Sequence, residues 1–260
     1  MKKWANTAIF GREGLWDLLI ENGTFVKIVK AGTKDFDSCE TLDLSGKMVC
    51  APFIEPHIHL DTTLTAGQPR WNESGTLFEG IQCWSERKVS LTKEDVKERA
   101  KKALSWQIAN GIGAVRTHVD TTDPSLVALE AMLEVKAEMK DLVDLQIVAF
   151  PQEGLISYRN GLELVEEALK MGADIVGGIP HFEFTREDGV QSVRDIFKLA
   201  MKYDKPIDIH CDEIDDEQSR HVEVVARETI MNDYQGRVTA SHTTAMGSYN
   251  DAYTYKLMRV

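Results

Sequence analysis

The stretch Pro56-His57-Ile58-His59-Leu60-Asp61 places two histidines one residue apart, directly after a short apolar run. In a β-strand, residues i and i+2 point to the same face, so His57 and His59 offer two imidazole nitrogens to one metal ion. Two later segments, 209–213 (IHCDE) and 240–243 (ASHT), each bring another histidine to the end of an apolar run. Together the three segments predict a metal-dependent hydrolase with its site at the ends of parallel strands.

The His-x-His pair is weak evidence by itself, because the chain contains seven histidines and a chance pair is an ordinary occurrence. Histidines near apolar runs are also often core residues. The three segments together are far more specific, since a barrel site draws its residues from the ends of several strands.

Charge and composition disfavour several classes of function. The chain has 30 basic and 42 acidic residues, and its net charge of -12 disfavours binding to a nucleic-acid backbone. With 43% hydrophobic residues, its 260 residues are enough for one large domain or two ordinary ones. We expect a small-molecule substrate, no nucleic-acid partner and a homo-oligomeric assembly.

The four cysteines, Cys39, Cys50, Cys83 and Cys211, have no C-x-x-C spacing, which is typical of reduced thiols in a cytoplasmic protein. The chain lacks a long apolar segment near its beginning, and no later stretch approaches ~20 apolar residues. We therefore expect neither secretion nor membrane insertion.

Residues 1–50 differ from the rest of the chain. They contain the short strand-like runs 18–20, 25–29 and 41–44, with turn signals at Glu21-Asn22-Gly23 and Ser45-Gly46-Lys47. We interpret them as a small β-module and residues 51–260 as a second domain.

From residue 51 onward, strands alternate with helices. Strand-like runs begin at Ala114, Leu145, Asp174, Ile207 and Val238, so that their starts are 31, 29, 33 and 31 residues apart. This spacing suits repeated βα units of ~30 residues. The runs are nearly all apolar, as expected for parallel strands that are covered on both faces.

The segments between these runs have helical patterns. The predicted features are a helix capped by Thr92 and ending before Gly111, one starting at Asp123-Pro124, one over 162–171 closed by Gly172, one around 193–200, and one over 217–233.

With the run at Phe53, six βα strands are predicted, whereas a (β/α)₈ barrel needs about eight. The chain ends in what is predicted to be the helix after strand six. An open doubly wound sheet is the structural alternative, but the sequence contains neither a G-x-G-x-x-G motif nor a P-loop to support it.

A hydrolytic metal site needs a few protein ligands and one open position for water. His57, His59 and His210 can supply three neutral nitrogens. Glu213 follows His210 by three residues and can shuttle a proton, although it also lies in an acidic run typical of a solvated loop. His242 ends strand six, where it is either part of the site or an ordinary polar residue at a strand end.

Other residues leave alternatives open. Gln152 follows strand three, and its amide can recognise a ring carbonyl and N–H together, although an ordinary loop glutamine is the default interpretation. Four residues near strand ends can line a pocket or serve the structure: His118, Asp120, His181 and Glu183. A helical surface position is predicted for His221. Packing roles are predicted for Trp71, Trp84 and Trp106.

The segments APFIEPHIHLDTTLTAGQP, AFPQEG, IPHFEFTRE, IHCDEIDDEQSR and VTASHTTAMGSYN resemble the motifs of bacterial cytosine deaminases, in the amidohydrolase superfamily. The resemblance runs from about residue 14 to the end. It implies a (β/α)₈ barrel with a small β-sandwich, of which residues 1–50 would be the first half. It also implies one divalent metal ion, Fe²⁺ or Zn²⁺, and hydrolysis of cytosine to uracil and ammonia in pyrimidine salvage.

The resemblance also implies a role for each site residue. His57, His59 and His210 would be metal ligands, and Glu213 would protonate the ring nitrogen and then the leaving amine. His242 would orient and polarise the attacking hydroxide, and Gln152 would hold the pyrimidine edge.

The chain departs from the family pattern at its end. The family's fourth ligand is an aspartate after strand eight, and this sequence stops before that strand, so we expect a fragment or a protein completed by a second piece. The alternatives are deamination of a related cyclic amidine, such as isocytosine, creatinine or an isoguanine-like base, or an inactive fragment. The H-x-E…P-C-x-x-C zinc deaminases are a poor match, because no P-C-x-x-C follows either H-x-E.

Overall fold

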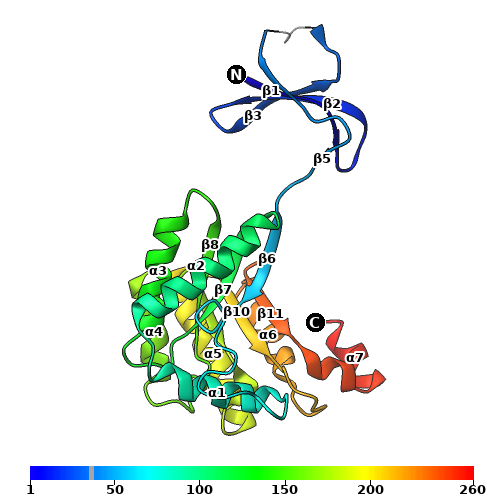
Figure 1. Ribbon diagram of the computed structural model, residues 1–260. Coiled ribbons are helices and arrows are strands. Elements are labelled where there is room, and N and C mark those ends of the chain that lie inside the picture. Colours follow the sequence, from blue (N-terminus) through cyan, green and yellow to red (C-terminus); the bar gives the residue numbers. More distant parts are fainter. Residues whose placement is uncertain (35–37) are drawn as a thin grey trace. The chain divides into compact units, whose positions relative to one another are not determined.

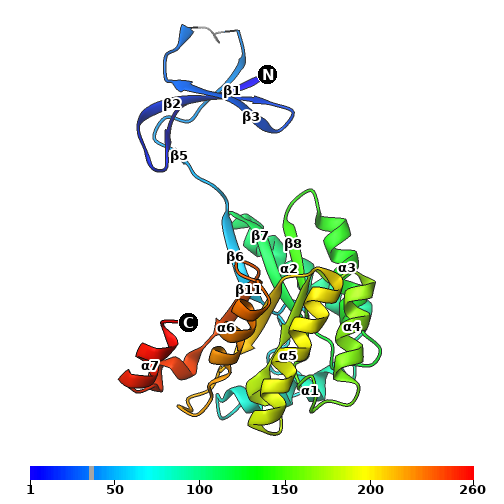
Figure 2. The same cartoon turned by 180° about the vertical axis from the view of Figure 1, so that it is seen from behind.

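The computed structural model describes residues 1–34 and 38–260, which divide into two compact units, Met1–Pro52 and Phe53–Val260. Figures 1 and 2 show the chain from opposite sides. Among the helices formed by the described residues, none has the length and apolar character that crossing a bilayer requires.

The strands of the N-terminal unit are β1 (Lys2–Ile9), β2 (Arg12–Glu21), β3 (Thr24–Lys30), β4 (Glu40–Asp43) and β5 (Met48–Val49). They form one sheet in the order β3-β2-β1-β4, with β5 also paired to β1. The neighbours β1–β2 and β2–β3 are antiparallel, whereas β4 and β5 run parallel to β1. Asn22 and Gly23 have φ angles of 50° and 77°, so the predicted turn joins β2 to β3 as a tight hairpin.

The central strand of this sheet, β1, is absent from the sequence prediction. Its buried positions include Lys3, Ala5 and Thr7, which are 8%, 6% and 0% exposed. Because two of these three side chains are polar, the strand lacks the apolar alternation by which strands are recognised.

The second unit contains a six-stranded sheet in which every neighbouring pair is parallel. Its strands are β6 (Phe53–Ile58), β7 (Ile112–Asp120), β8 (Asp144–Phe150), β9 (Ile175–Gly178), β10 (Ile207–Cys211) and β11 (Val238–His242). They lie in sequence order and the sheet curls as part of a barrel does (Figure 1). A doubly wound sheet would instead reverse its strand order at a switch point. The unit therefore has the strand order and curl of six consecutive strands of a (β/α) barrel.

The helices of this unit are α1 (Leu77–Lys88), α2 (Lys93–Ala109), α3 (Val127–Met139), α4 (Gly161–Met171), α5 (Arg186–Tyr203), α6 (His221–Met231) and α7 (Asp251–Leu257). Helices α2 to α6 cover the outer face of the sheet, whereas α1 and α7 lie away from that face (Figures 1 and 2). Short 3₁₀ turns, η2 (Pro180–Phe182) and η3 (Thr244–Ser248), follow β9 and β11. The main core lies between helices and sheet. At Gly178 an added Cβ would lie only 2.2 Å from the Ile196 side chain, so α5 packs almost directly on β9.

The predicted starts of five barrel strands agree with the structure to within two residues. Thr92 caps α2 by accepting a hydrogen bond from the Asp95 amide, and Gly111 (φ 86°) follows the helix end as predicted. Gly172 closes α4, also as predicted.

The predicted start of the third helix at Asp123-Pro124 is wrong, because α3 begins at Val127. The Asp123 carboxylate accepts hydrogen bonds from the Ser125 amide (3.1 Å) and hydroxyl (2.6 Å), and Leu126 takes a left-handed conformation (φ 50°). This local side-chain turn competes with helical hydrogen bonding and delays the helix.

The predictions of a helix from Glu217 and of an exposed His221 are also wrong. Helix α6 begins at His221, which is 6% exposed. The Asp212 carboxylate, just after β10, accepts hydrogen bonds from the amides of His221 (3.0 Å) and Val222 (2.8 Å) and contacts His221 Nδ1 (2.9 Å). A carboxylate from a distant strand end thus supplies the cap that the local sequence lacks.

Candidate active site

One cleft of about 640 Å³ lies at the carboxyl ends of the barrel strands. Its lining includes all six residues for which the sequence predicts site roles: His57, His59, Gln152, His210, Glu213 and His242. His57 lies on β6, His210 on β10 and His242 at the end of β11, while the other three follow strand ends. The structure brings the six residues together, and their individual roles remain predictions.

Five of the seven histidines form one cluster. The Nε2 atoms of His59 and His210 are 3.1 Å apart, and the ring centroid of His57 lies 4.7 Å from that of His210 and 4.5 Å from that of His242. The fifth member is His118 on β7, whose ring centroid lies 4.1 Å from that of His57. Such crowding is favourable only for uncharged rings or around a shared cation.

Burial favours the neutral form of these rings. It lowers the pKa of His57 to about 4, and it holds the pKa values of His59 and His210 well below the usual range, with the neighbouring histidines adding to the effect. The pKa of His242 is lowered by the same cause. Neutral imidazole is the form that binds metal ions. These histidines are already neutral at neutral pH, so they can bind a metal ion without first losing a proton.

The hydrogen bonding of the cluster fits a metal ion. Within the described part of the chain, His57 Nε2, His210 Nδ1 and both ring nitrogens of His118 are buried without a hydrogen-bond partner. Buried polar atoms in native proteins nearly always have a partner, so several buried nitrogens without one, gathered in one place, fit the coordination of a metal ion. The donor set, all imidazole, suits zinc or iron.

The geometry permits more than one ligand set. Ligand nitrogens within 4.8 Å of one another are found for His57, His210 and His242, and separately for His57, His59 and His118. His118, which the sequence left open between pocket and structural roles, therefore belongs to the cluster. Its Nε2 lies 3.5 Å from the buried Asp208 carboxylate, which Arg116 also contacts at 2.8 Å.

Glu213 and His242 are neighbours in the lining of the cleft. His242 Nδ1 lies 3.5 Å from Glu213 Oε1, and burial raises the pKa of Glu213 to about 7. His242 and Thr243 have left-handed backbones, with φ angles of 66° and 51°. A carboxyl group that titrates near pH 7 is suited to giving and taking protons, and unusual backbone conformations of this kind gather at functional sites.

Asp61 ends the opening motif and lies beneath the cluster, fully buried. Its Oδ2 accepts a hydrogen bond from the Asp120 amide (2.8 Å), while its Oδ1 has no partner among the described residues. Burial raises the pKa of this carboxyl to about 7. Asp61 thus connects the histidine strand β6 to the end of β7.

Asp120, Glu183 and His181 do not line this cleft. Asp120 and Glu183 instead hold the loop after β8. Glu183 accepts hydrogen bonds from the amides of Leu155 (2.7 Å) and Ser157 (2.8 Å). His181 lines a neighbouring cavity with His221, and burial lowers its pKa to about 4.

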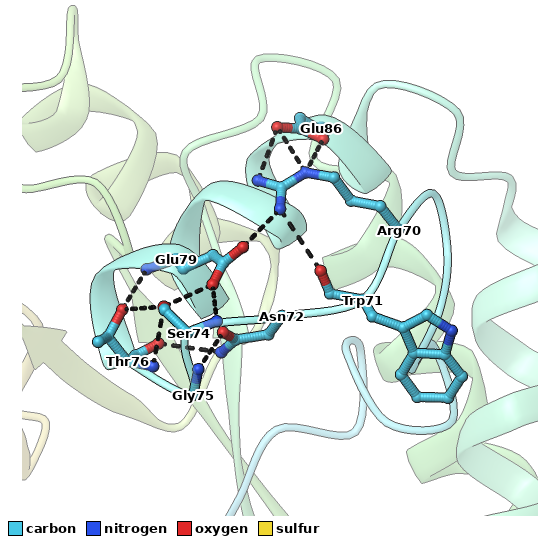
Figure 3. Close-up of polar contacts among 8 residues, drawn as sticks. All are labelled: Arg70, Trp71, Asn72, Ser74, Gly75, Thr76, Glu79 and Glu86. Carbon is cyan, nitrogen blue, oxygen red and sulfur yellow. Dashed lines mark hydrogen bonds and ion pairs between the residues drawn. The ribbon is translucent and has the colours of Figure 1, made fainter.

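The segment before α1 forms one wall of the cleft and is fastened by Arg70 (Figure 3). Arg70 donates to Glu79 Oε1 (2.8 Å) and to Glu86 Oε2 (3.0 Å), two carboxylates of α1. Glu79 also accepts from the Ser74 amide (2.6 Å). One guanidinium therefore joins the wall to two points along the helix.

The three tryptophans for which packing roles are predicted differ from one another. Trp84 is buried, as its predicted packing role requires, and its Nε1 donates to Asp120 Oδ2 (2.8 Å). The packing prediction is wrong for Trp106, which is 54% exposed beneath the Lys102 ammonium, and for Trp71, which is 67% exposed at the cleft wall. At Gly67 an added Cβ would lie 2.9 Å from the Trp71 ring, which explains the glycine there.

Comparison with known proteins places this geometry in a family. The Amidohydrolase family profile matches residues 40–259. The N-isopropylammelide isopropyl amidohydrolase of Pseudomonas sp. (strain ADP) is 32% identical over 246 residues, a match that covers 91% of this chain and 59% of that protein.

Solved structures are similar over almost the whole chain. A crystal structure of 5-methylcytosine deaminase from Klebsiella pneumoniae liganded with 5-fluorocytosine has a TM-score of 0.95 and 52% identity, covering 99% of this chain and 62% of that one. N-isopropylammelide isopropylaminohydrolase from Burkholderia multivorans has a TM-score of 0.82 and 26% identity, covering 99% and 64%. The chain thus spans 59% to 64% of the length of these three proteins.

Proposed function

The chain belongs to the amidohydrolase family, and we propose that it hydrolyses cytosine to uracil and ammonia at a metal centre formed by its histidine cluster. The observation that carries the proposal is the meeting of the histidine cluster, Glu213 and Gln152 in one cleft. Support for a cytosine-type base comes from the 52% identity to a 5-methylcytosine deaminase.

In this proposal His57, His59 and His210 hold one divalent ion, Fe²⁺ or Zn²⁺. When bound, such an ion supplies a Lewis acid that lowers the pKa of water towards ~7. The proposed ligands come from two strands that lie far apart in the sequence, so the folded sheet fixes their spacing.

Glu213 is the proposed proton carrier. It gives a proton to the ring nitrogen next to the amino carbon, which makes that carbon more electrophilic. The resulting carboxylate takes a proton from the attacking water as its oxygen bonds to the carbon, and Glu213 gives this second proton to the departing amine. A carboxyl group with a pKa of about 7 is protonated often enough to act as an acid near neutral pH. His242, 3.5 Å away, orients the attacking oxygen and stabilises the charge on Glu213 when the carboxyl is ionised.

Gln152 is the proposed reader of the base. Its side-chain amide carries one acceptor and two donors, so it can pair with a ring carbonyl and an adjacent ring N–H at once. A site built to pair with both rejects bases that lack either group, because its own polar atoms would then be left unpaired.

The test is hydrolysis by the full chain after loading with Fe²⁺ or Zn²⁺. Cytosine, 5-methylcytosine, isocytosine and creatinine are offered separately, and both ammonia and the deaminated product are measured. We expect cytosine or 5-methylcytosine to have the highest kcat/KM. A preference for isocytosine or creatinine would contradict the assignment of the base.

A second candidate is removal of an alkylamino group from a triazine ring. The relationship to N-isopropylammelide amidohydrolases, at 32% and 26% identity, supports it. Both reactions replace an exocyclic nitrogen by oxygen on a nitrogen heterocycle. Release of isopropylamine from N-isopropylammelide, measured beside cytosine turnover, separates the two.

A further inference from the structure

The loop that carries Gln152 is held by a buried ionic network that the proposed mechanism does not use. The centre of this network is Lys88, in the last turn of α1, whose side chain is 9% exposed. Its ammonium donates to Glu153 Oε1 (2.5 Å), Thr122 Oγ1 (2.8 Å) and Asp120 Oδ2 (3.2 Å). Lys88 thus joins α1 to the ends of two strands at once.

Asp120 carries the connection to Gln152. Its Oδ1 accepts hydrogen bonds from the Thr122 amide (2.7 Å) and from the backbone amide of Gln152 (3.3 Å), which also donates to the Phe150 carbonyl (3.1 Å). Its Oδ2 accepts from Trp84 as well as Lys88. The backbone of the base-reading residue is therefore one hydrogen bond away from the carboxylate that Lys88 neutralises.

Glu153 provides a second connection, from the next residue of the same loop. Its Oε1 accepts from Ser85 Oγ at 2.5 Å in addition to Lys88. Three side chains of α1 therefore hold the loop: Trp84 through Asp120, Ser85 through Glu153, and Lys88 through both carboxylates.

The charges of Asp120 and Glu153 explain why a cationic side chain lies between them. Two ionised carboxylates this close together repel each other, and an ammonium group placed between them offsets the repulsion. Burial lowers the pKa of Lys88, but the two carboxylates more than reverse this and leave its pKa raised, so the ammonium stays charged. Buried ion pairs seldom add net stability relative to apolar packing, which makes a role in precise positioning the better explanation for the network.

We propose that Lys88 is a positioning residue. It holds the loop that carries Gln152 in the position from which the side-chain amide of Gln152 can hydrogen-bond to the edge of the base. The substrate in this inference is taken from the proposed function. The restraint that Lys88 places on the loop does not depend on which substrate binds. A binding site loses affinity for its substrate when the residues that support a substrate-contacting side chain become mobile. A displacement of even ~1 Å is enough to break paired hydrogen bonds.

The experiment compares Lys88→Met with Lys97→Met in the metal-loaded full chain. Lys97 also contacts two carboxylates, Glu134 (2.5 Å) and Glu138 (2.8 Å), but it joins α2 to α3 away from the cleft. For Lys88→Met we expect KM for cytosine to rise by about tenfold or more while kcat stays within about threefold. For Lys97→Met both constants should stay within about twofold of the unaltered chain.

A double-mutant cycle with Gln152→Ala separates positioning from general destabilisation. If Lys88 acts through Gln152, then Lys88→Met should change KM by less than about twofold when Gln152 is already alanine. An equal KM change in both backgrounds would overturn the proposal. Should Lys88→Met fold poorly, Lys88→Arg and Ser85→Ala complete the same cycle with milder changes, and the same criterion applies.

Hydrogen exchange provides a readout that needs no turnover. In Lys88→Met the amide of Gln152 should exchange at least about tenfold faster, whereas amides of the Glu183-bound residues 155–157 should change little. Unchanged exchange at Gln152 would overturn the proposal. If the unaltered chain deaminates none of the bases, the proposed function fails, and this measurement still decides whether Lys88 holds the loop.

Discussion

The Nε2 atoms of His59 and His210 lie 3.1 Å apart, although 151 residues separate the two histidines in the sequence. Both rings have pKa values well below the usual range, so neither is charged near neutral pH. Two nitrogens about 2.05 Å from a tetrahedral ion are about 3.3 Å apart. The pair is therefore already close to the spacing that one shared metal ion requires.

The first prediction concerns metal binding. Saturating Zn²⁺ or Fe²⁺ should raise the free energy of unfolding of the full chain by up to about 4 kcal/mol at a thousand times Kd, because the ion binds the folded cluster preferentially. His210→Asn should lose most of this increase and most of the bound metal, measured by urea unfolding and elemental analysis. His181→Asn is the matched control from the neighbouring cavity and should keep both. Full metal content in His210→Asn would contradict the ligand assignment.

The second prediction concerns the proton carrier. Glu213→Gln should keep its metal and fold but lose about 10²–10⁴-fold in kcat, because the amide cannot transfer a proton. In the unaltered chain, kcat/KM for cytosine should fall above about pH 7, as Glu213 loses the proton that it must donate. Glu217→Gln, an exposed neighbour in the same acidic run, serves as the control and should be unaffected. Near-normal kcat in Glu213→Gln would reject the role.

The third prediction concerns Asp61 and stability. Its folded-state pKa of about 7 lies above that of an ordinary aspartate, so the folded chain binds more protons between about pH 4 and pH 7. The contribution of Asp61 to stability is therefore greatest at acid pH and is lost as the pH rises through 7.

Asp61→Asn removes this titration. The stability of the variant relative to the unaltered chain should rise between pH 5 and pH 8, by at most about 4 kcal/mol, since one pKa unit corresponds to about 1.4 kcal/mol. Urea unfolding of both proteins in the presence of chelator measures the difference. A constant difference across this range would show that Asp61 does not titrate there.

The fourth prediction concerns the cleft wall in Figure 3. Arg70→Met removes the links to Glu79 and Glu86, so cleavage by a protease within residues 66–76 should become faster, while global stability changes by less than about 1 kcal/mol. Arg159→Met, at another exposed arginine, is the control. Equal cleavage rates in the two variants would show that Arg70 does not hold the wall.

Much of the barrel can be predicted from the sequence, because its middle strands β8, β9 and β10 are largely buried and appear as apolar runs at regular spacing. Their histidines follow those runs, and parallel strands bring their carboxyl ends to one edge of the sheet, so the meeting of His57, His210 and His242 follows from topology alone.

The features that escaped prediction depend on hydrogen-bond partners outside the element concerned or on local polar turns. The buried position of His221 depends on Asp212, which caps α6 from the end of β10. Strand β1 escaped prediction because polar side chains occupy two of its buried positions. The start of α3 was placed too early because the side-chain turn at Asp123 precedes the helix. Lys88 has no motif of its own, since its importance arises only from the two carboxylates that the fold places beside it.

Metal-dependent ammonia release from cytosine is measured with the full chain, first stripped of metal with a chelator and then reloaded with Fe²⁺ or Zn²⁺. We expect no release from the stripped protein and, after reloading to about one ion per chain, one ammonia for each uracil formed. Release that persists at the same rate in the stripped protein would show that hydrolysis does not need the ion. A reloaded protein that holds its ion at the histidine cluster and releases no ammonia from cytosine would refute the proposed hydrolysis.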